Sequence, residues 1–209
     1  MRSIEQLSAR RPMGIGTFII QVYLSSIDRL SLAGQAGSMC RTQIRPARPD
    51  DEERIRRFLA GLSLHTQTLR FFTGVTAPAA PLVRALLAVD ERRDALVVTS
   101  EEGEIIGHAM SYRGGCADVE IAVVVTDAWQ GRGLGPELIA ELLLRASVKG
   151  AKTVGMDVLG ENRRVLRLIR RLWPRATMKV SSGSVEVTAR IDEAGLFAEQ
   201  GSGSTPLTV

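Results

Sequence analysis

The second half of the chain contains a buried strand followed by an amphipathic helix. Residues Val119–Val125 are apolar except for Glu120, which is typical of a central strand buried on both faces. In residues 134–147, apolar side chains recur at 134, 138 and 142 and, on the adjoining stripe, at 139, 143 and 146. This is the period of a helix with one side in the core, and Gly150 follows it at a place where helices commonly end.

The remaining pattern predicts further strands and helices on both sides of this unit. Hairpins are expected early in the chain and a strand-helix-strand unit later, so we predict an α+β fold with a central, mostly antiparallel sheet and helices on both faces. The other expected strands are residues 42–45, 95–99, 105–112 and 153–159, and a hairpin over 178–191. The other expected helices are residues 49–62, 66–72, 81–89 and 162–172.

Length and composition predict a single domain. With 209 residues and 44% hydrophobic content, the chain can bury one good core. We place the domain at residues 41–192, after a weakly structured N-terminal extension over 1–40. Residues 193–209 contain the run Gly-Ser-Gly-Ser and are expected to form a disordered C-terminal tail.

Charge and cysteine content restrict the partners and the compartment. The net charge of +4 and the pI of 9.6 favour acidic partners, among them phosphate-rich cofactors, nucleic acid and anionic lipid. Cys40 and Cys116 have no metal-ligand spacing, so we expect no metal and a reducing cytoplasm. The apolar stretch 13–24 is too short to cross a membrane, and as a signal peptide it is interrupted by Gln21.

A glycine-rich loop joins the buried strand to the amphipathic helix. It reads Gln130, Gly131, Arg132, Gly133, Leu134 and Gly135. Glycines let the backbone approach oxygen atoms closely, and the first turn of a helix offers free N–H groups, so the loop suits a diphosphate. Its spacing fits neither a Walker A loop nor a dinucleotide fingerprint. A tight turn without any ligand is the alternative interpretation.

The loop, as Gln-x-x-Gly-x-Gly, resembles motif A of the GNAT N-acetyltransferase superfamily. Two further segments extend the resemblance over residues 42–191: residues 158–164, which contain Asn162, and residues 44–52 with the later Leu-Arg-Phe-Phe at 69–72. The latter look like the opening of the GNAT domain of bacterial protein-lysine acetyltransferases. The resemblance implies acetyl-CoA as cosubstrate and an amine as acceptor, either a protein lysine or a small molecule.

The same resemblance assigns roles to individual residues. It implies that the backbone of Val123, Val124 and Val125 holds the pantetheine arm and stabilises the oxyanion, and that Asn162 contacts the same arm. Asn162 could equally be a helix N-cap. The family's tyrosine, which protonates the leaving thiolate, would stand near Ile169, so the general acid is in doubt. A thiol pKa of about 8.5 makes departure without one tolerable.

Glu120 is the candidate catalytic base. Acyl transfer needs a neutral amine, whereas a lysine-like amine has a pKa of about 10.4, so a base must take its proton. Residues 117–122 are similar to the family segment whose glutamate does this. A carboxylate among Ile and Val side chains is expected to have a raised pKa, although a paired structural glutamate is the alternative. His108 and Tyr112, on the neighbouring strand, are candidates for the acceptor pocket or ordinary buried positions.

Three classes of function remain. The first is an acetyl-CoA-dependent N-acetyltransferase, favoured by Glu120 and the complete loop. The second is a non-catalytic module that binds acetyl-CoA as a regulatory signal, favoured by the missing tyrosine. A nucleic-acid binder is disfavoured because no aromatic residues are interleaved with the arginines. A homodimer stays an open alternative.

Overall fold

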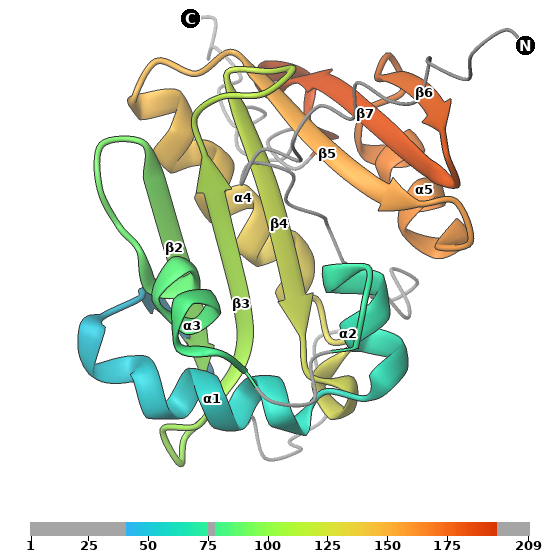
Figure 1. The fold of residues 1–209 in the computed structure, drawn as a ribbon. Coiled ribbons are helices and arrows are strands. Elements are labelled where there is room, and N and C mark those ends of the chain that lie inside the picture. Colours follow the sequence, from blue (N-terminus) through green and yellow to red (C-terminus); the bar gives the residue numbers. More distant parts are fainter. Residues whose placement is uncertain (1–40, 75–77, 196–209) are drawn as a thin grey trace, which may run out of the picture.

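The computed structural model describes residues 41–74 and 78–195, which form a seven-stranded sheet with helices on both faces (Figure 1). The strand order is β1-β2-β3-β4-β5-β7-β6. Every neighbouring pair is antiparallel except β4 and β5, which are parallel. The strands are β1 (Gln43–Pro46), β2 (Arg93–Thr99), β3 (Ile105–Tyr112), β4 (Val119–Val125), β5 (Thr153–Leu159), β6 (Thr177–Ser181) and β7 (Ser184–Arg190). The predicted fold class is confirmed.

Helices cover the two faces of the sheet in two groups (Figure 1). One face carries α1 (Glu52–Gly61), α2 (Leu64–Phe71) and α3 (Ala80–Leu87). The other carries α4 (Leu134–Val148) and α5 (Arg163–Leu172). Short 3-10 helices at Pro49–Asp51, Asp127–Trp129 and Ile191–Glu193 complete the secondary structure of the described residues.

Strand β4 separates two hydrophobic cores. Its odd-numbered residues from 119 to 125 pack into the core that contains the apolar sides of α4 and α5. Ala122 and Val124 pack into the core that contains α1 and α3. Since side chains alternate along a strand, Glu120 shares the face of Ala122 and Val124.

The observed bounds follow the predictions with local differences. Strands β4 and β5 have the predicted bounds. The predicted helix at 49–62 begins as a 3-10 turn, because the Asp51 carboxylate accepts from the Arg48 N–H at 2.9 Å and binds Arg45 through two contacts of 2.7 Å. Helix α2 starts two residues before the predicted position, because the Ser63 hydroxyl accepts from the Thr66 N–H at 3.2 Å and caps it.

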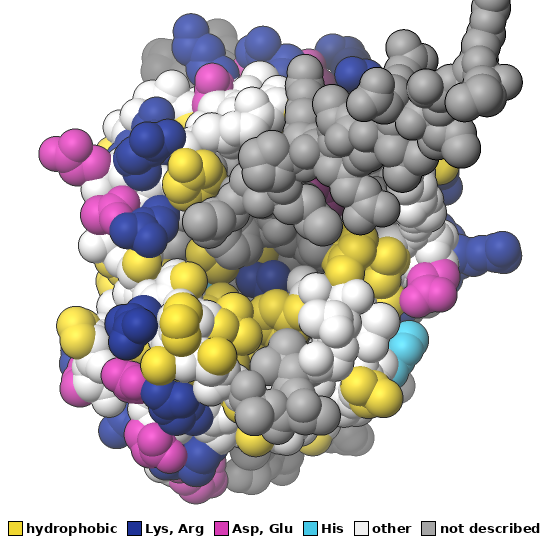
Figure 2. Space-filling model, viewed as in Figure 1, with side chains coloured by type: hydrophobic (Ala, Val, Ile, Leu, Met, Phe, Trp, Pro, Cys, Tyr) yellow, Lys and Arg dark blue, Asp and Glu magenta, His cyan; other side chains and the backbone are white. Residues whose placement is uncertain are grey.

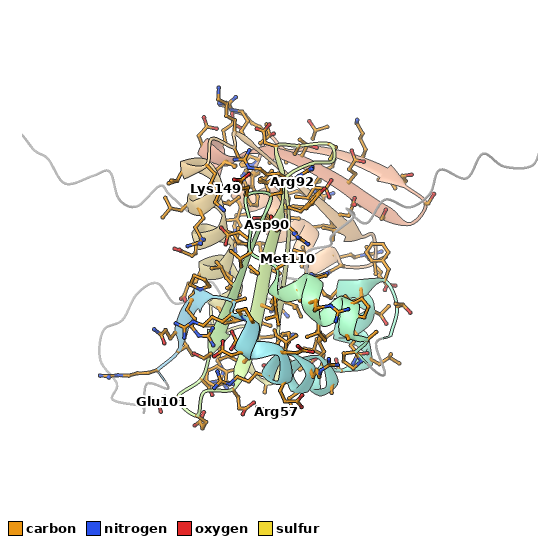
Figure 3. The ribbon with its side chains drawn as sticks, turned by 60° about the vertical axis from the view of Figure 1, so that its left-hand side comes forward. Arg57, Asp90, Arg92, Glu101, Met110 and Lys149 are labelled. Atoms are coloured by element: carbon orange, nitrogen blue, oxygen red, sulfur yellow. The ribbon has the colours of Figure 1, made fainter. Side chains whose placement is uncertain are left out.

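Charged residues gather at the two ends of the sheet. Arg57 and Glu101 lie at one end and Arg92 and Lys149 at the other, with Met110 between them (Figure 3). At the second end, buried Asp94 binds Arg145 at 3.0 Å and Lys149 at 3.2 Å, which ties β2 to α4. Because both cations are partly exposed, this clamp fixes the helix without burying an unpaired charge.

Two predicted segments fall mainly outside the described residues. The expected extension over 1–40 lies wholly outside them, as does the expected tail apart from residues 193–195. Within these three, Ala194 is buried in the core beside α5. None of the helices in the described ranges is long and apolar enough to span a bilayer.

Candidate active site at the splayed strands

Strands β4 and β5 run parallel but separate soon after they meet. Their pairing consists of Val119 with Val154 and Glu120 with Gly155, although both strands continue beyond this point. Figure 1 shows them diverging from there on. Past Glu120, β4 therefore keeps its β3 partner on one edge, and on the other edge, which we call the opening, it pairs with no strand of the described residues.

Alternation along β4 decides which backbone groups face this opening. The Thr126 N–H donates to the Ile106 carbonyl of β3 at 2.9 Å. Since successive residues of a strand point their backbone groups to opposite edges, the N–H groups of Val123 and Val125 face the opening. The backbone of Val124 faces β3, so two of the three predicted valines present donors to the splay.

The loop after β4 forms a second group of donors. Gly131 and Gly133 adopt positive φ angles of 80° and 91°, which glycine takes without strain. Leu134 and Gly135 open helix α4, where backbone N–H groups have no acceptor inside the helix and the helix dipole is positive. Arg132 stacks on Trp129, with its guanidinium carbon 4.6 Å from the ring centre. The predicted loop therefore has the geometry of an anion-binding turn.

Gln130 points its side chain back toward the sheet. Its amide nitrogen donates to the Val125 carbonyl at 3.0 Å and approaches the Thr66 hydroxyl at 3.4 Å. The side chain thus closes the end of β4 and links it to α2. The backbone N–H of Gln130 bonds to the Asp127 carbonyl at 3.3 Å, so Gln130 shapes the loop.

Asp127 fastens α2 to the same loop. Its carboxylate accepts from the Ser63 N–H at 3.0 Å, the Ser63 hydroxyl at 2.7 Å and the Thr66 hydroxyl at 2.8 Å. Burial acts to raise the pKa of Asp127, but the hydrogen bonds from Ser63 and Thr66 outweigh it and the pKa is lowered. The carboxylate is therefore ionised at neutral pH, which strengthens the anchor.

Glu120 lies on the last paired rung before the strands separate. It is 8% exposed and stands opposite Tyr112 of β3. Gly115, with a φ of 93°, passes so close that an added Cβ would collide with the Glu120 carboxylate, and a Cβ at Gly155 would lie 3.2 Å from Glu120 Cγ. Two glycines therefore make room for this side chain at the mouth of the splay.

Comparison with known proteins shows the family of the chain. The model of the Acetyltransferase (GNAT) family matches residues 63–172, more than half of the chain. This range contains α2, Glu120, the glycine loop and Asn162. The chain belongs to the GNAT acetyltransferase family.

Individual relatives agree with this assignment. The chain is 31% identical over 153 residues to acetyltransferase Pat of Mycolicibacterium smegmatis, over 69% of this chain and 45% of that protein. It is also 31% identical over 105 residues to an acetyltransferase of Pseudomonas aeruginosa, over 48% of this chain and 56% of that protein. The chain thus spans about half the length of these two relatives. The crystal structure of the GNAT domain of S. lividans PAT superposes with a TM-score of 0.65 at 25% identity, over 71% of this chain and 90% of that one.

Asn162 has one of the two roles considered for it, the helix N-cap. Its side-chain oxygen accepts from the Val165 N–H at 3.3 Å and caps α5, which confirms the N-cap. It is 5% exposed and follows β5 directly, at the far end of the strand that forms one side of the splay. Ile169, where the GNAT tyrosine was sought, is 2% exposed in the core, so it supplies neither an acid nor an opening.

Two further features were missed by sequence reasoning. Ser63, Thr66 and Asp127 form the anchor between α2 and the loop, and only the capping residue Ser63 carried a recognisable signal. Arg70 is 2% exposed, although arginines at such positions usually lie on a helix surface. The periodicity of 66–72 could have indicated it, since Arg70 lies one turn after buried Thr66.

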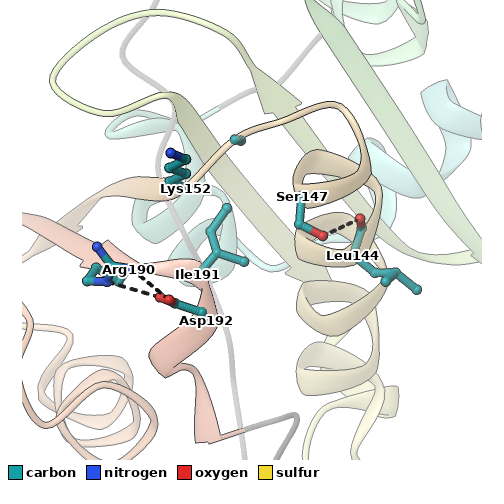
Figure 4. Close-up of a pocket in the computed structure, with 7 residues that line it drawn as sticks. Leu144, Ser147, Lys152, Arg190, Ile191 and Asp192 are labelled. Atoms are coloured by element: carbon teal, nitrogen blue, oxygen red, sulfur yellow. Dashed lines mark hydrogen bonds and ion pairs between the residues drawn. The ribbon is translucent and has the colours of Figure 1, made fainter.

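A pocket of about 610 Å³ lies at the opposite end of α4 from the glycine loop (Figure 4). It is lined by Leu144, Ser147, Ala151, Lys152, Arg190, Ile191 and Asp192. The hydroxyl of Ser147 bonds to the Leu144 carbonyl, and Arg190 pairs with Asp192. Two of its polar side chains, Ser147 and Arg190, are thus already engaged, and neither Glu120 nor the glycine loop lines it. Within residues 41–74 and 78–195, no group of three or more His, Cys, Asp or Glu side chains is arranged to hold a metal.

Proposed function

We propose that this chain transfers an acetyl group from acetyl-CoA to an amine, with Glu120 as the catalytic base and a protein lysine as one class of acceptor. The observation that carries the proposal is the position of Glu120 on the rung where β4 and β5 separate. The carboxylate lies beside the opening into which the N–H groups of Val123 and Val125 point. A candidate base and candidate donors therefore lie along the same strand, β4, beside the same opening.

The glycine loop and the edge of β4 fit two parts of acetyl-CoA, the diphosphate and the pantetheine arm. Gly131 to Gly135 form a turn with free N–H groups at the start of α4, which suits a diphosphate. The unpaired edge of β4 is an extended backbone that suits the amide groups of a pantetheine arm. Bound there, acetyl-CoA supplies an activated acyl group, and the protein supplies orientation and proton transfer.

Each residue then has a defined task in the transfer. The Glu120 carboxylate accepts a proton from the ammonium form of the acceptor, directly or through water, which leaves a nucleophilic lone pair on nitrogen. One of the N–H groups of Val123 and Val125, which stand about 7 Å apart along the strand, donates to the thioester oxygen, where negative charge develops, and the other is available to the pantetheine arm. With Ile169 in the place of a tyrosine, the thiolate leaves without a dedicated acid from α5, which its pKa of about 8.5 allows.

The decisive experiment measures CoA release from acetyl-CoA by wild type and Glu120→Gln with a panel of small amines and lysine peptides. Glu120→Gln is expected to lower kcat by roughly 10²- to 10⁴-fold while the Kd for acetyl-CoA stays unchanged. Glu104→Gln is the matched control, because Glu104 is exposed and pairs with Arg57 outside the site. Wild-type turnover that survives in Glu120→Gln would reject Glu120 as the base.

A regulatory module that binds acetyl-CoA without turnover is the second candidate, and buried Ile169 favours it. Its signature is tight binding of acetyl-CoA by wild type with no CoA release for any acceptor. If acetyl-CoA does not bind, both candidates fail.

A further inference from the structure

Arg70 is a buried cation that has no counter-charge among the described residues. Its side-chain atoms Nε and Nη2 are shielded from solvent and have no hydrogen-bond partner. Burial alone lowers the pKa of Arg70 to about 10, so the guanidinium is still charged at neutral pH. Its one favourable contact among the described residues is with the ring of Phe71, 4.8 Å from the guanidinium carbon. Burying an unpaired charge is costly, so this residue calls for a partner.

Two other buried charges of the described chain, Asp51 and Asp94, are compensated by basic side chains. Asp51, which is fully buried, binds Arg45 and Arg54. Asp94, 3% exposed, binds Arg145 and Lys149. Arg70 departs from this pattern, which indicates that its counter-charge comes from a bound molecule.

Neighbouring groups place Arg70 on the face of the sheet that carries Glu120. Burial is the main cause that lowers the pKa of His108, and the charge of Arg70 lowers it further. His108 stands opposite Val124 of β4, and its Nε2 bonds to the Leu86 carbonyl of α3 at 2.8 Å. Helix α2, which carries Arg70, and α3, which bonds to His108, both cover the Val124 face of β4, which is also the face of Glu120.

The path of α2 holds Arg70 in place. Arg70 lies one helical turn after Thr66, and residues four apart on a helix share one side. Thr66 is fastened to Asp127 in the glycine-loop segment. The guanidinium is thereby positioned relative to the proposed cofactor loop.

The surface over this region is hollowed. Figure 2 shows a depression in the face that carries α2 and α3, with hydrophobic side chains along part of its rim. Hydrophobic walls strengthen the attraction between a guanidinium and an anion because they exclude water. We propose that Arg70 binds a carboxylate of the acceptor, so that the chain prefers amines that carry a carboxylate. This inference rests on the proposed function, since it names the substrate class of the same site.

Strand register gives the span that such an acceptor must bridge. His108 and Tyr112 are four residues apart on β3 and stand opposite Val124 and Glu120, which corresponds to about 13 Å along the strand. The guanidinium can extend into this interval, so the amine and carboxylate must be separated by several bonds. Lysine satisfies this with its own α-carboxylate, and a lysine peptide satisfies it with an acidic residue two positions away, about 7 Å along an extended chain.

Kinetics on two matched acceptor pairs test the proposal. One pair is lysine and lysinamide, and the other is a peptide with Asp or Asn two residues after its lysine. Wild type is expected to prefer the carboxylate member of at least one pair by roughly 10- to 100-fold in kcat/KM, the range for one charged hydrogen-bonded contact. The pair that shows the preference identifies whether a free amino acid or a peptide is the source of the carboxylate. Equal kcat/KM within both pairs would overturn the proposal.

Variants connect any preference to Arg70. Arg70→Met is expected to abolish the preference and Arg70→Lys to retain part of it, with an unchanged Kd for acetyl-CoA in both. Arg84→Met removes an exposed cation of α3 and is expected to keep the wild-type preference. Because Arg70→Met removes an uncompensated buried charge, its Tm is expected to match or exceed that of wild type. A Tm well below wild type, or a preference that survives in Arg70→Met, would show that Arg70 is structural.

A binding measurement separates this proposal from the proposed function. Nε-acetyl-lysine and Nε-acetyl-lysinamide are titrated calorimetrically into the full chain with CoA present, so that no turnover is needed. The carboxylate form is expected to bind about tenfold more tightly to wild type and equally to Arg70→Met. If no amine is acetylated but this difference is found, the transferase proposal fails and the carboxylate site stands. If lysine is the preferred acceptor of the transferase, and Nε-acetyl-lysine and Nε-acetyl-lysinamide bind equally tightly to wild type, the carboxylate site fails. The transferase proposal then stands.

Discussion

The Asp127 carboxylate, in the segment after β4, accepts hydrogen bonds from both the backbone N–H and the hydroxyl of Ser63, at 3.0 and 2.7 Å. The two residues are 64 positions apart. This contact fixes the start of α2 against the loop that we propose to bind the cofactor. It therefore couples the acceptor side of the site to the cofactor side.

Asp127→Ala is expected to weaken both stability and acetyl-CoA binding. Loss of the contacts to Ser63 and Thr66 should cost about 1–2 kcal/mol of unfolding free energy and raise the Kd for acetyl-CoA, as measured by denaturant titration and calorimetry. Asp90→Ala is the matched control, because Asp90 also accepts from two backbone N–H groups but lies away from the loop. An equal rise in Kd in both variants would contradict the coupling.

Gly115→Ala is expected to reduce activity more than stability. The new Cβ would displace the Glu120 carboxylate, so kcat should fall at least tenfold, while the positive φ costs about 1 kcal/mol. Gly103→Ala carries the same kind of strain, with a φ of 78°, but its Cβ would meet nothing within 4 Å. Steady-state kinetics should therefore separate the two variants. Similar kcat values at similar stabilities would show that the position of Glu120 is unimportant.

Two variants separate the role of Asn162 as a helix cap from its proposed role in binding acetyl-CoA. Asn162→Ala should cost about 1 kcal/mol of stability, since α5 loses its N-cap. Asn162→Asp keeps an acceptor for the Val165 N–H and should retain stability. We expect both variants to bind acetyl-CoA more weakly, because both lack the side-chain amide donor. Normal binding by Asn162→Asp would restrict Asn162 to its structural role.

His108 is expected to make folding pH-dependent. Burial lowers its pKa from 6.5 to about 4, so the unfolded chain binds a proton between these values while the folded chain does not. Stability therefore falls as pH decreases through this window, by about 2 kcal/mol between pH 7 and pH 5. Denaturant titrations at the two pH values should show a smaller loss for His108→Gln. The exposed His65 gives the control His65→Gln, whose loss should equal that of wild type.

Sequence reasoning was most successful where local pattern and tertiary burial agree. Strand β4 is apolar along nearly its whole length, and α4 has two regular stripes, so both were predicted closely. Helix α2 was harder, because its start depends on Ser63 as a cap and on Asp127, which is distant in sequence. The predicted start of α1 was wrong for a similar reason, because the ion pair of Asp51 with Arg45 favours a tighter first turn.

The site was predictable only as far as its motif extends. Gln130 to Gly135, Glu120 and Asn162 stand at motif positions, and the geometry places them around the splay or along the strands that form it. No sequence motif predicts that Arg70 is buried, since its burial depends on how α2 and α3 pack over the sheet. The direction of the Val124 backbone also required the sheet register, because a strand of three valines looks uniform in sequence.

The alternation of β4 has a consequence for how this chain can vary. Because β4 is fixed against β3 and β5 on opposite edges, deleting one residue between Gly115 and Val119 would rotate the strand's pattern by half a period. Glu120 would then point into the hydrophobic core under α4, and Ile121 would take its place beside the opening. Insertions and deletions should therefore be tolerated in the turn at Gly103, whereas the connection between β3 and β4 must keep its length.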